Sequence, residues 1–177
     1  LGSVSRAVAA RADRPVAIVP AGGAWSDGPI VVGHDGSPGG DAALAWAIGA
    51  SDGPVTVVSA WHLPSDAIYD PTVIDVEAFE AGIRDRLDQS IAALADQDPV
   101  GMVRSRVTTV VQRDDPRLSL VEHSKDASFL VLGARSHRGV RGLLLGSTVD
   151  YVAAHTHQVV VIVPPLHDGE DEATDDG

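Results

Sequence analysis

The sequence contains neither cysteine nor asparagine, and each absence removes a class of structure or site. Without cysteine the chain has no disulfide framework, no thiolate zinc site and no cysteine nucleophile. Without asparagine it has no acceptor for N-glycosylation. No apolar run approaches the roughly 18 residues of a membrane-spanning helix. We therefore expect a soluble protein of a reducing, cytoplasmic compartment with no membrane partner.

Basic residues are few, 13 against 25 acidic ones, so the formal net charge is −12. This balance argues against nucleic acid as a partner, because nucleic-acid affinity depends on neutralising phosphates. Six acidic residues fall within the last ten positions, which predicts an acidic disordered tail over residues 165–177. The rest of the chain keeps a charge of −6, from −12 + 6.

Several familiar nucleotide-binding and hydrolase motifs are also missing. The single lysine, Lys125, precedes Asp126, so there is no GxxxxGK[ST] phosphate-binding loop. The dinucleotide fingerprint GxGxxG is absent, as are HExxH and GxSxG. These absences argue against the usual kinases, dehydrogenases, metalloproteases and α/β-hydrolases.

What the sequence does contain is an internal repeat. Residues 1–20 (LGSVSRAVAARADRPVAIVP) align without gaps with residues 145–164 (LGSTVDYVAAHTHQVVVIVP), and ten of twenty positions are identical at an offset of 144. This match outweighs an N-terminal targeting helix as an explanation, since such a helix need not copy the C-terminus. We expect residues 1–20 to be the last helix and strand of a preceding domain copy, with about 115 residues of that copy upstream.

The repeat divides the chain into four parts: residues 1–20, a Gly/Pro-rich linker over 21–29, one complete domain over 30–164, and the acidic tail. Within the domain, short apolar runs predict strands at 30–34, 55–61, 129–132 and 159–163. Residues 103–111 alternate in character, which predicts an edge strand. Helices are predicted at 41–48, 74–95, 116–125 and 147–154. Strands that alternate with helices predict an α/β fold of the flavodoxin or Rossmann type, a doubly wound parallel sheet with helices on both faces.

Two segments lie at the carboxyl ends of predicted strands, where doubly wound sheets bind ligands. One is VVGHDGS at residues 31–37, and the other is GARSHRGVRGLLLGST at 133–148. The second segment brings Gly146 and Ser147 to a helix start, where backbone N–H groups can hold a phosphate. Alternatively, Ser147 only caps that helix, with Asp150 three residues later, and the loop arginines at 135, 138 and 141 are solvated.

These segments, together with TVVSAWH, FLVLG and the closing VVVIVP strand, resemble the universal stress protein family. Nucleotide-binding members carry the motif G-x2-G-x9-G-[ST]. Here the frame reads Gly133-x2-Ser136-x9-Gly146-Ser147, so Ser136 replaces the second glycine. The resemblance covers residues 30–164, and residues 1–20 match the end of a preceding family domain, as in tandem members.

The resemblance implies a five-stranded sheet in the order 3-2-1-4-5 and a stress-response regulator with little or no catalysis. It implies binding of ATP or a related adenine nucleotide, with Mg or Mn as a divalent cation. Asp35 would contact the adenosine end, Ala60 the adenine, and Gly133 and Arg135 the ribose and phosphates. The full set of expected site residues is Asp35, Ala60, Gly133, Arg135, Ser136, Gly146, Ser147 and Thr148.

Two other functions stay open. A dimeric interaction module that binds no nucleotide is favoured by Ser136, because a non-glycine residue at φ > 0 costs about 1–2 kcal/mol. A slow nucleotide hydrolase is the other. His34 and His62 end strands near the predicted site and could touch a ligand.

Finally, we expect the apolar edge strand 159–163 to pair antiparallel with residues 16–19, within one chain or across a homodimer.

Overall fold

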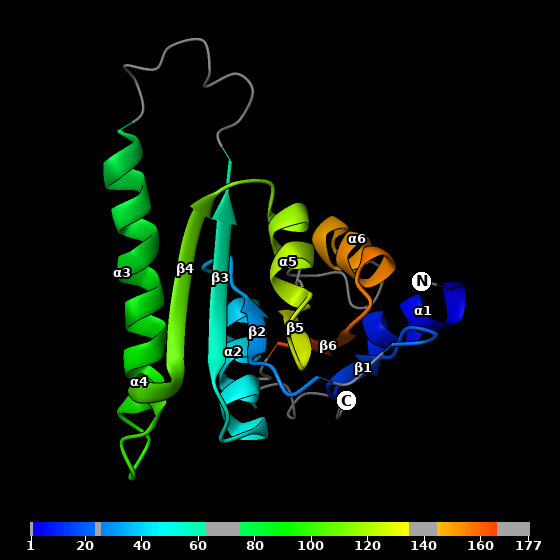
Figure 1. Ribbon diagram of the computed structural model, residues 1–177, viewed down its shortest axis with the longest axis horizontal. Coiled ribbons are helices and arrows are strands. Elements are labelled where there is room, and N and C mark those ends of the chain that lie inside the picture. Colours follow the sequence, from blue (N-terminus) through cyan, green and yellow to red (C-terminus); the bar gives the residue numbers. More distant parts are fainter. Residues whose placement is uncertain (1, 24–25, 63–74, 135–144, 166–177) are drawn as a thin grey trace, which may run out of the picture.

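The protein is described by a computed structural model covering residues 2–23, 26–62, 75–134 and 145–165. Figure 1 shows how its helices and strands are arranged. In chain order they are α1 (Ser3–Arg11), β1 (Val16–Ile18), β2 (Ile30–Gly33), α2 (Pro38–Ala50), β3 (Val55–Trp61), α3 (Val76–Ala95), α4 (Val103–Arg106), β4 (Val107–Arg113), α5 (Pro116–Ser124), β5 (Phe129–Gly133), α6 (Ser147–His155) and β6 (Val159–Val163). The predicted acidic tail lies outside the described residues, apart from Pro165.

One six-stranded sheet organises the fold, in the order β1-β6-β5-β2-β3-β4. The five strands from β2 to β6 are mutually parallel. Their order is the predicted 3-2-1-4-5, so the expected α/β fold class is confirmed. The central strands are apolar along their whole length because helices cover both of their faces, as parallel sheets require.

The helices divide between the two faces of the sheet. On one face, α2 and α3 cover the alternate residues Ile30 and Val32 of β2. On the other, α1, α5 and α6 cover Val31, the residue between them. Successive strand residues point to opposite faces, so each side receives its own apolar core. Figure 1 shows α3 beside β4 at one end of the molecule and α1 at the other.

The sixth strand, β1, pairs antiparallel with β6 within the same chain. Its register joins Val16 to Ile162, Ala17 to Val161 and Ile18 to Val160. This confirms the predicted pairing of residues 16–19 with 159–163 in its intramolecular form. The pairing covers the apolar edge of β6, which is buried along its whole length.

Two predicted elements need correction. Helix α2 begins at Pro38 rather than residue 41, because the Ser37 side chain caps it and Pro38 fits the first turn. The predicted strand 103–111 begins only at Val107, since residues 103–106 form the helical turn α4. The Asp98 carboxylate stabilises that turn by accepting the Val103 N–H at 2.8 Å.

Within the described ranges, no helix has both the length and the apolar character needed to cross a membrane.

Candidate functional site

A cavity of about 150 Å³ opens at the carboxyl ends of β2, β3 and β5. This is the edge where doubly wound sheets bind their ligands. The first turns of α2 and α6 also reach it, so two helix N-termini face one space. Its described lining is Gly33, His34, Asp35, Ser37, Gly40, Val58, Ala60, Pro116, Leu120, Leu132, Gly133, Ala134, Leu145, Gly146, Thr148 and Val149.

The loop after β2 is a tight turn that leads directly into α2. Gly36 has φ +77°, a conformation that side-chain-bearing residues rarely adopt. The Asp35 carboxylate accepts the Ser37 N–H at 3.1 Å, and the Ser37 hydroxyl accepts the Gly40 N–H at 3.2 Å. Asp35 and the capped start of α2 are therefore held together at the cavity.

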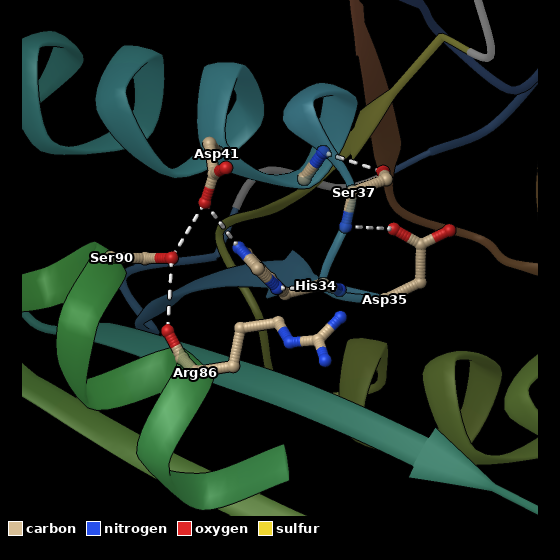
Figure 2. Close-up of polar contacts among 8 residues, drawn as sticks. His34, Asp35, Ser37, Asp41, Arg86 and Ser90 are labelled. Atoms are coloured by element: carbon tan, nitrogen blue, oxygen red, sulfur yellow. Dashed lines mark hydrogen bonds and ion pairs between the residues drawn. The ribbon is translucent and has the colours of Figure 1, made fainter. Parts of the chain in front are cut away.

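The His34 side chain holds this loop in place through hydrogen bonds from its ring. Its side chain is fully buried, and its Nδ1 accepts the Gly36 N–H at 3.1 Å. Because Nδ1 is an acceptor, the ring proton lies on Nε2, which contacts Asp41 Oδ1 at 3.0 Å. The same oxygen accepts the Ser90 hydroxyl at 2.6 Å. Figure 2 shows His34 between Asp41 on α2 and the Asp35 turn, with Ser90 and Arg86 reaching in from α3.

Gly133 ends β5 against the first turn of α2. A Cβ atom at this position would lie 2.1 Å from the Gly39 carbonyl oxygen, far inside van der Waals contact. The two backbones can approach this closely only because residue 133 is glycine. The glycine therefore brings the end of β5 and the start of α2 together at the cavity wall.

The start of α6 differs from the expectation. Gly146, with φ +80°, precedes the helix, and Ser147 is its first residue rather than its N-cap. Asp150 does not close a capping box; it forms an ion pair with Arg6 of α1. Since no side chain caps this end within the described residues, the first N–H groups of α6 are available to an anion.

The start of α5 also lines the cavity, with Pro116 and Leu120. Asp115 caps this helix by accepting the Arg117 N–H at 2.9 Å. The Arg117 guanidinium, which also bonds this carboxylate, lowers the pKa of Asp115 from 3.8 to about 2. Asp115 is ionised near neutral pH, and its negative charge is favourable at a helix N-terminus.

The structure brings five of the eight predicted site residues to one cavity, namely Asp35, Ala60, Gly133, Gly146 and Thr148. Ser147 lies between two of these but is not itself part of the lining. Arg135 and Ser136 lie outside the described residues, as do the arginines at 138 and 141. His34 lines the cavity, whereas His62 is solvent-exposed and is not in the described lining.

The expected site residues left out Ser37 and Gly40, which line the same cavity, although Ser37 lies in the segment 31–37 that was expected to bind a ligand. A signal for them was present, because serine followed by proline is a common start of a helix. In the described part of the chain, no cluster of three or more His, Asp or Glu side chains could hold a metal ion.

In a comparison with known families, the profile of the universal stress protein family matches residues 28–164. The chain belongs to the universal stress protein family. A relative, universal stress protein Rv2005c of Mycobacterium tuberculosis, is 32% identical over 168 residues, which is 92% of this chain and 55% of that protein. The chain thus spans about half the length of the curated relatives it matches.

Solved structures show the same fold. A universal stress protein in complex with cAMP is 25% identical, with a TM-score of 0.51, over 81% of this chain and 99% of that one. A universal stress protein from Archaeoglobus fulgidus has a TM-score of 0.59 at 21% identity. That match covers 97% of this chain but 56% of the other.

Proposed function

We propose that this universal stress protein binds ATP or a related adenine nucleotide in the cavity at the ends of β2, β3 and β5. In this proposal it acts in the cytoplasm as a stress-response regulator with little or no turnover. The observation that carries the proposal is the convergence of two helix N-termini, of α2 and α6, on a cavity that Asp35 also lines. The N–H groups at the start of α6, which no described side chain caps, and the dipoles of both helices favour phosphate there.

The family resemblance suggests which part of the nucleotide each residue contacts. Asp35 would contact the adenosine end and Ala60 the adenine, while Gly133 and Arg135 would border the ribose and phosphates. Gly146, Ser147 and Thr148 would donate to the phosphates from the start of α6, with Arg135 and Ser136 in the preceding loop. A bound Mg²⁺ or Mn²⁺ would offset phosphate charge. The family member solved with cAMP supports an adenine nucleotide as the ligand class.

Two alternative functions differ in the support they have. Ser136 replaces the motif glycine, which favours a dimeric interaction module that binds no nucleotide. A slow nucleotide hydrolase would need a base at the phosphates, and the described His34 ring already uses both nitrogens. We therefore rank binding without turnover above hydrolysis.

We also propose that residues 1–20 are the last helix and strand of a preceding copy of the domain. Helix α1 (3–11) and helix α6 (147–155) coincide when shifted by 144, the offset of the sequence repeat. Val8 is 53% exposed, whereas its equivalent Val152 is fully buried. A preceding copy would cover Val8, and the relatives' roughly doubled length leaves room for one.

Titration calorimetry with ATP and Mg²⁺ tests the nucleotide proposal. We expect heat and a thermal shift for the native chain, and roughly a tenfold weaker Kd for Asp35→Ala. The matched control is Asp88→Ala, which removes an exposed carboxylate of α3 and should bind as the native chain does. A native chain that gives neither heat nor thermal shift contradicts nucleotide binding and favours the interaction module. Phosphate release under the same conditions would instead favour the hydrolase.

A further inference from the structure

The pairing of β1 with β6 has an internal twofold symmetry. In the repeat, Val16 is equivalent to Val160 and Ile18 is equivalent to Ile162. When each residue is replaced by its equivalent, the pair Val16–Ile162 becomes the pair Ile18–Val160, which is also present in the register. The pair Ala17–Val161 maps onto itself and lies at the centre. An interface that is unchanged when its two halves are exchanged is self-complementary. By backbone geometry alone, two β6 edges could therefore pair with each other as readily as β1 pairs with β6.

The charges at this interface break that symmetry. Arg6 and Asp150 occupy equivalent positions, since 6 + 144 = 150, and they contact each other. Arg6 Nε lies 3.0 Å from Asp150 Oδ1, an oxygen that is buried and has no aligned hydrogen bond in the described structure. Equivalent residues that touch must lie at the symmetry axis. Any pairing of like edges would therefore place Asp150 against Asp150, or Arg6 against Arg6.

We propose that Arg6 and Asp150 select the partner of the α6–β6 edge. In this proposal they direct that edge to the α1–β1 segment and away from a second copy of itself. Opposite charges stabilise the unlike pairing, while like charges at the axis oppose the like one. The Asp150 side chain is 30% exposed, so salt screens its charge less than that of a fully exposed carboxylate. The register of the strands allows either pairing, and the charges of Arg6 and Asp150 determine which pairing forms.

Charge reversal in the full chain tests the proposal. Arg6→Asp and Asp150→Arg each place like charges at the axis. We expect the hydrogen-exchange protection of the β1 amides bonded to β6 to fall about five- to tenfold in each variant. The double reversal, Arg6→Asp with Asp150→Arg, restores opposite charges and should return protection to within about threefold of native. Arg14→Asp is the matched control, because it reverses an exposed arginine of the same segment and should leave protection unchanged.

A mixing experiment tests the choice of partner. Arg6→Asp carries two acidic residues at these positions and Asp150→Arg two basic ones, so neither pairs well with itself. In an equal mixture, each edge can meet an opposite charge by exchanging α1–β1 segments between chains. At about 1 mM, comparable to the effective concentration of a short linker, sedimentation should show a heterodimer only in the mixture. A mixture that sediments as monomers, or a double reversal that restores no protection, overturns the proposal.

Discussion

At the scale of single residues, the cavity depends on contacts that leave no room for substitution. Gly133 is the strictest case, because the Gly39 carbonyl oxygen occupies the space that its Cβ would need. A methyl group at residue 133 would push the end of β5 away from the first turn of α2. Both elements line the cavity, so stability and ligand binding should respond together.

We predict that Gly133→Ala lowers the free energy of unfolding by about 3 kcal/mol, as overpacking of a tight contact does. It should also abolish detectable nucleotide binding. Gly82→Ala is the matched control: the glycine lies in α3 with nothing within 4 Å of its Cβ position. Alanine there should raise stability by about 0.5–1 kcal/mol, because it favours helix. Urea unfolding measures both, and equal effects of the two substitutions would contradict the steric argument.

The same scale shows which site residues a sequence can reveal. Asp35, Gly133 and Gly146 belong to a recognisable pattern, and all three line the cavity. The role of His34 could not be predicted, because it depends on Asp41 and Ser90, which other elements supply. A single sequence shows that a histidine ends a strand but does not show which atoms meet its ring.

At the scale of elements, the C-terminal end of α2 depends on an arginine from α4. The last carbonyl groups of a helix have no partner within the helix. The Arg106 guanidinium donates to the Ile48 carbonyl at 2.6 Å and also to the Ser51 carbonyl. A cation in this place also offsets the negative end of the helix dipole.

We predict that Arg106→Ala lowers the free energy of unfolding by about 2 kcal/mol, the scale of charged hydrogen bonds lost to carbonyl groups. Arg104→Ala is the control, since that arginine is exposed on the same short helix. Its effect should stay within about 0.5 kcal/mol. Guanidinium unfolding compares the two, and similar losses would show that general charge, rather than the α2 carbonyls, explains the effect.

The same segment explains why one element boundary was wrong. Residues 103–111 alternate in character as a strand does, yet the first four form α4. The cause is local: Asp98 accepts the backbone N–H groups of Val100 and Val103 and holds the chain in a turn. Side-chain bonds to nearby backbone compete with strand formation, and hydrophobic alternation carries no information about them.

At the scale of the whole molecule, the repeat was the most informative part of the sequence. It predicted that residues 16–19 meet residues 159–163, and these strands are adjacent in the sheet. This long-range contact was predictable because an apolar edge strand needs a partner, and the repeat identified residues 16–19 as the equivalent of that strand in a preceding copy. The opposite charges of Arg6 and Asp150 could be read in the sequence, but their contact appears only in the folded chain.

The exposed face of α1 gives a final test of the proposed preceding copy. Val8 and Val152 are equivalent in the repeat, but Val8 is 53% exposed, whereas Val152 is fully buried on the face of α6 that joins the core. In this chain we expect Val152→Ala to lower the free energy of unfolding by about 2 kcal/mol, because it removes buried methyl groups. Val8→Ala should change it by less than about 0.5 kcal/mol.

A longer chain that carries a preceding copy would change only one of these results. There the copy would bury Val8 as the core of this domain buries Val152 here, so Val8→Ala should cost about 2 kcal/mol as well. Thermal unfolding of Val8→Ala and Val152→Ala, each made in both the shorter and the longer chain, measures the four stability losses. A Val8→Ala cost that stays near zero in the longer chain would mean that α1 keeps its exposed face. In that case α1 would serve only the edge of β6 and would not complete a second domain.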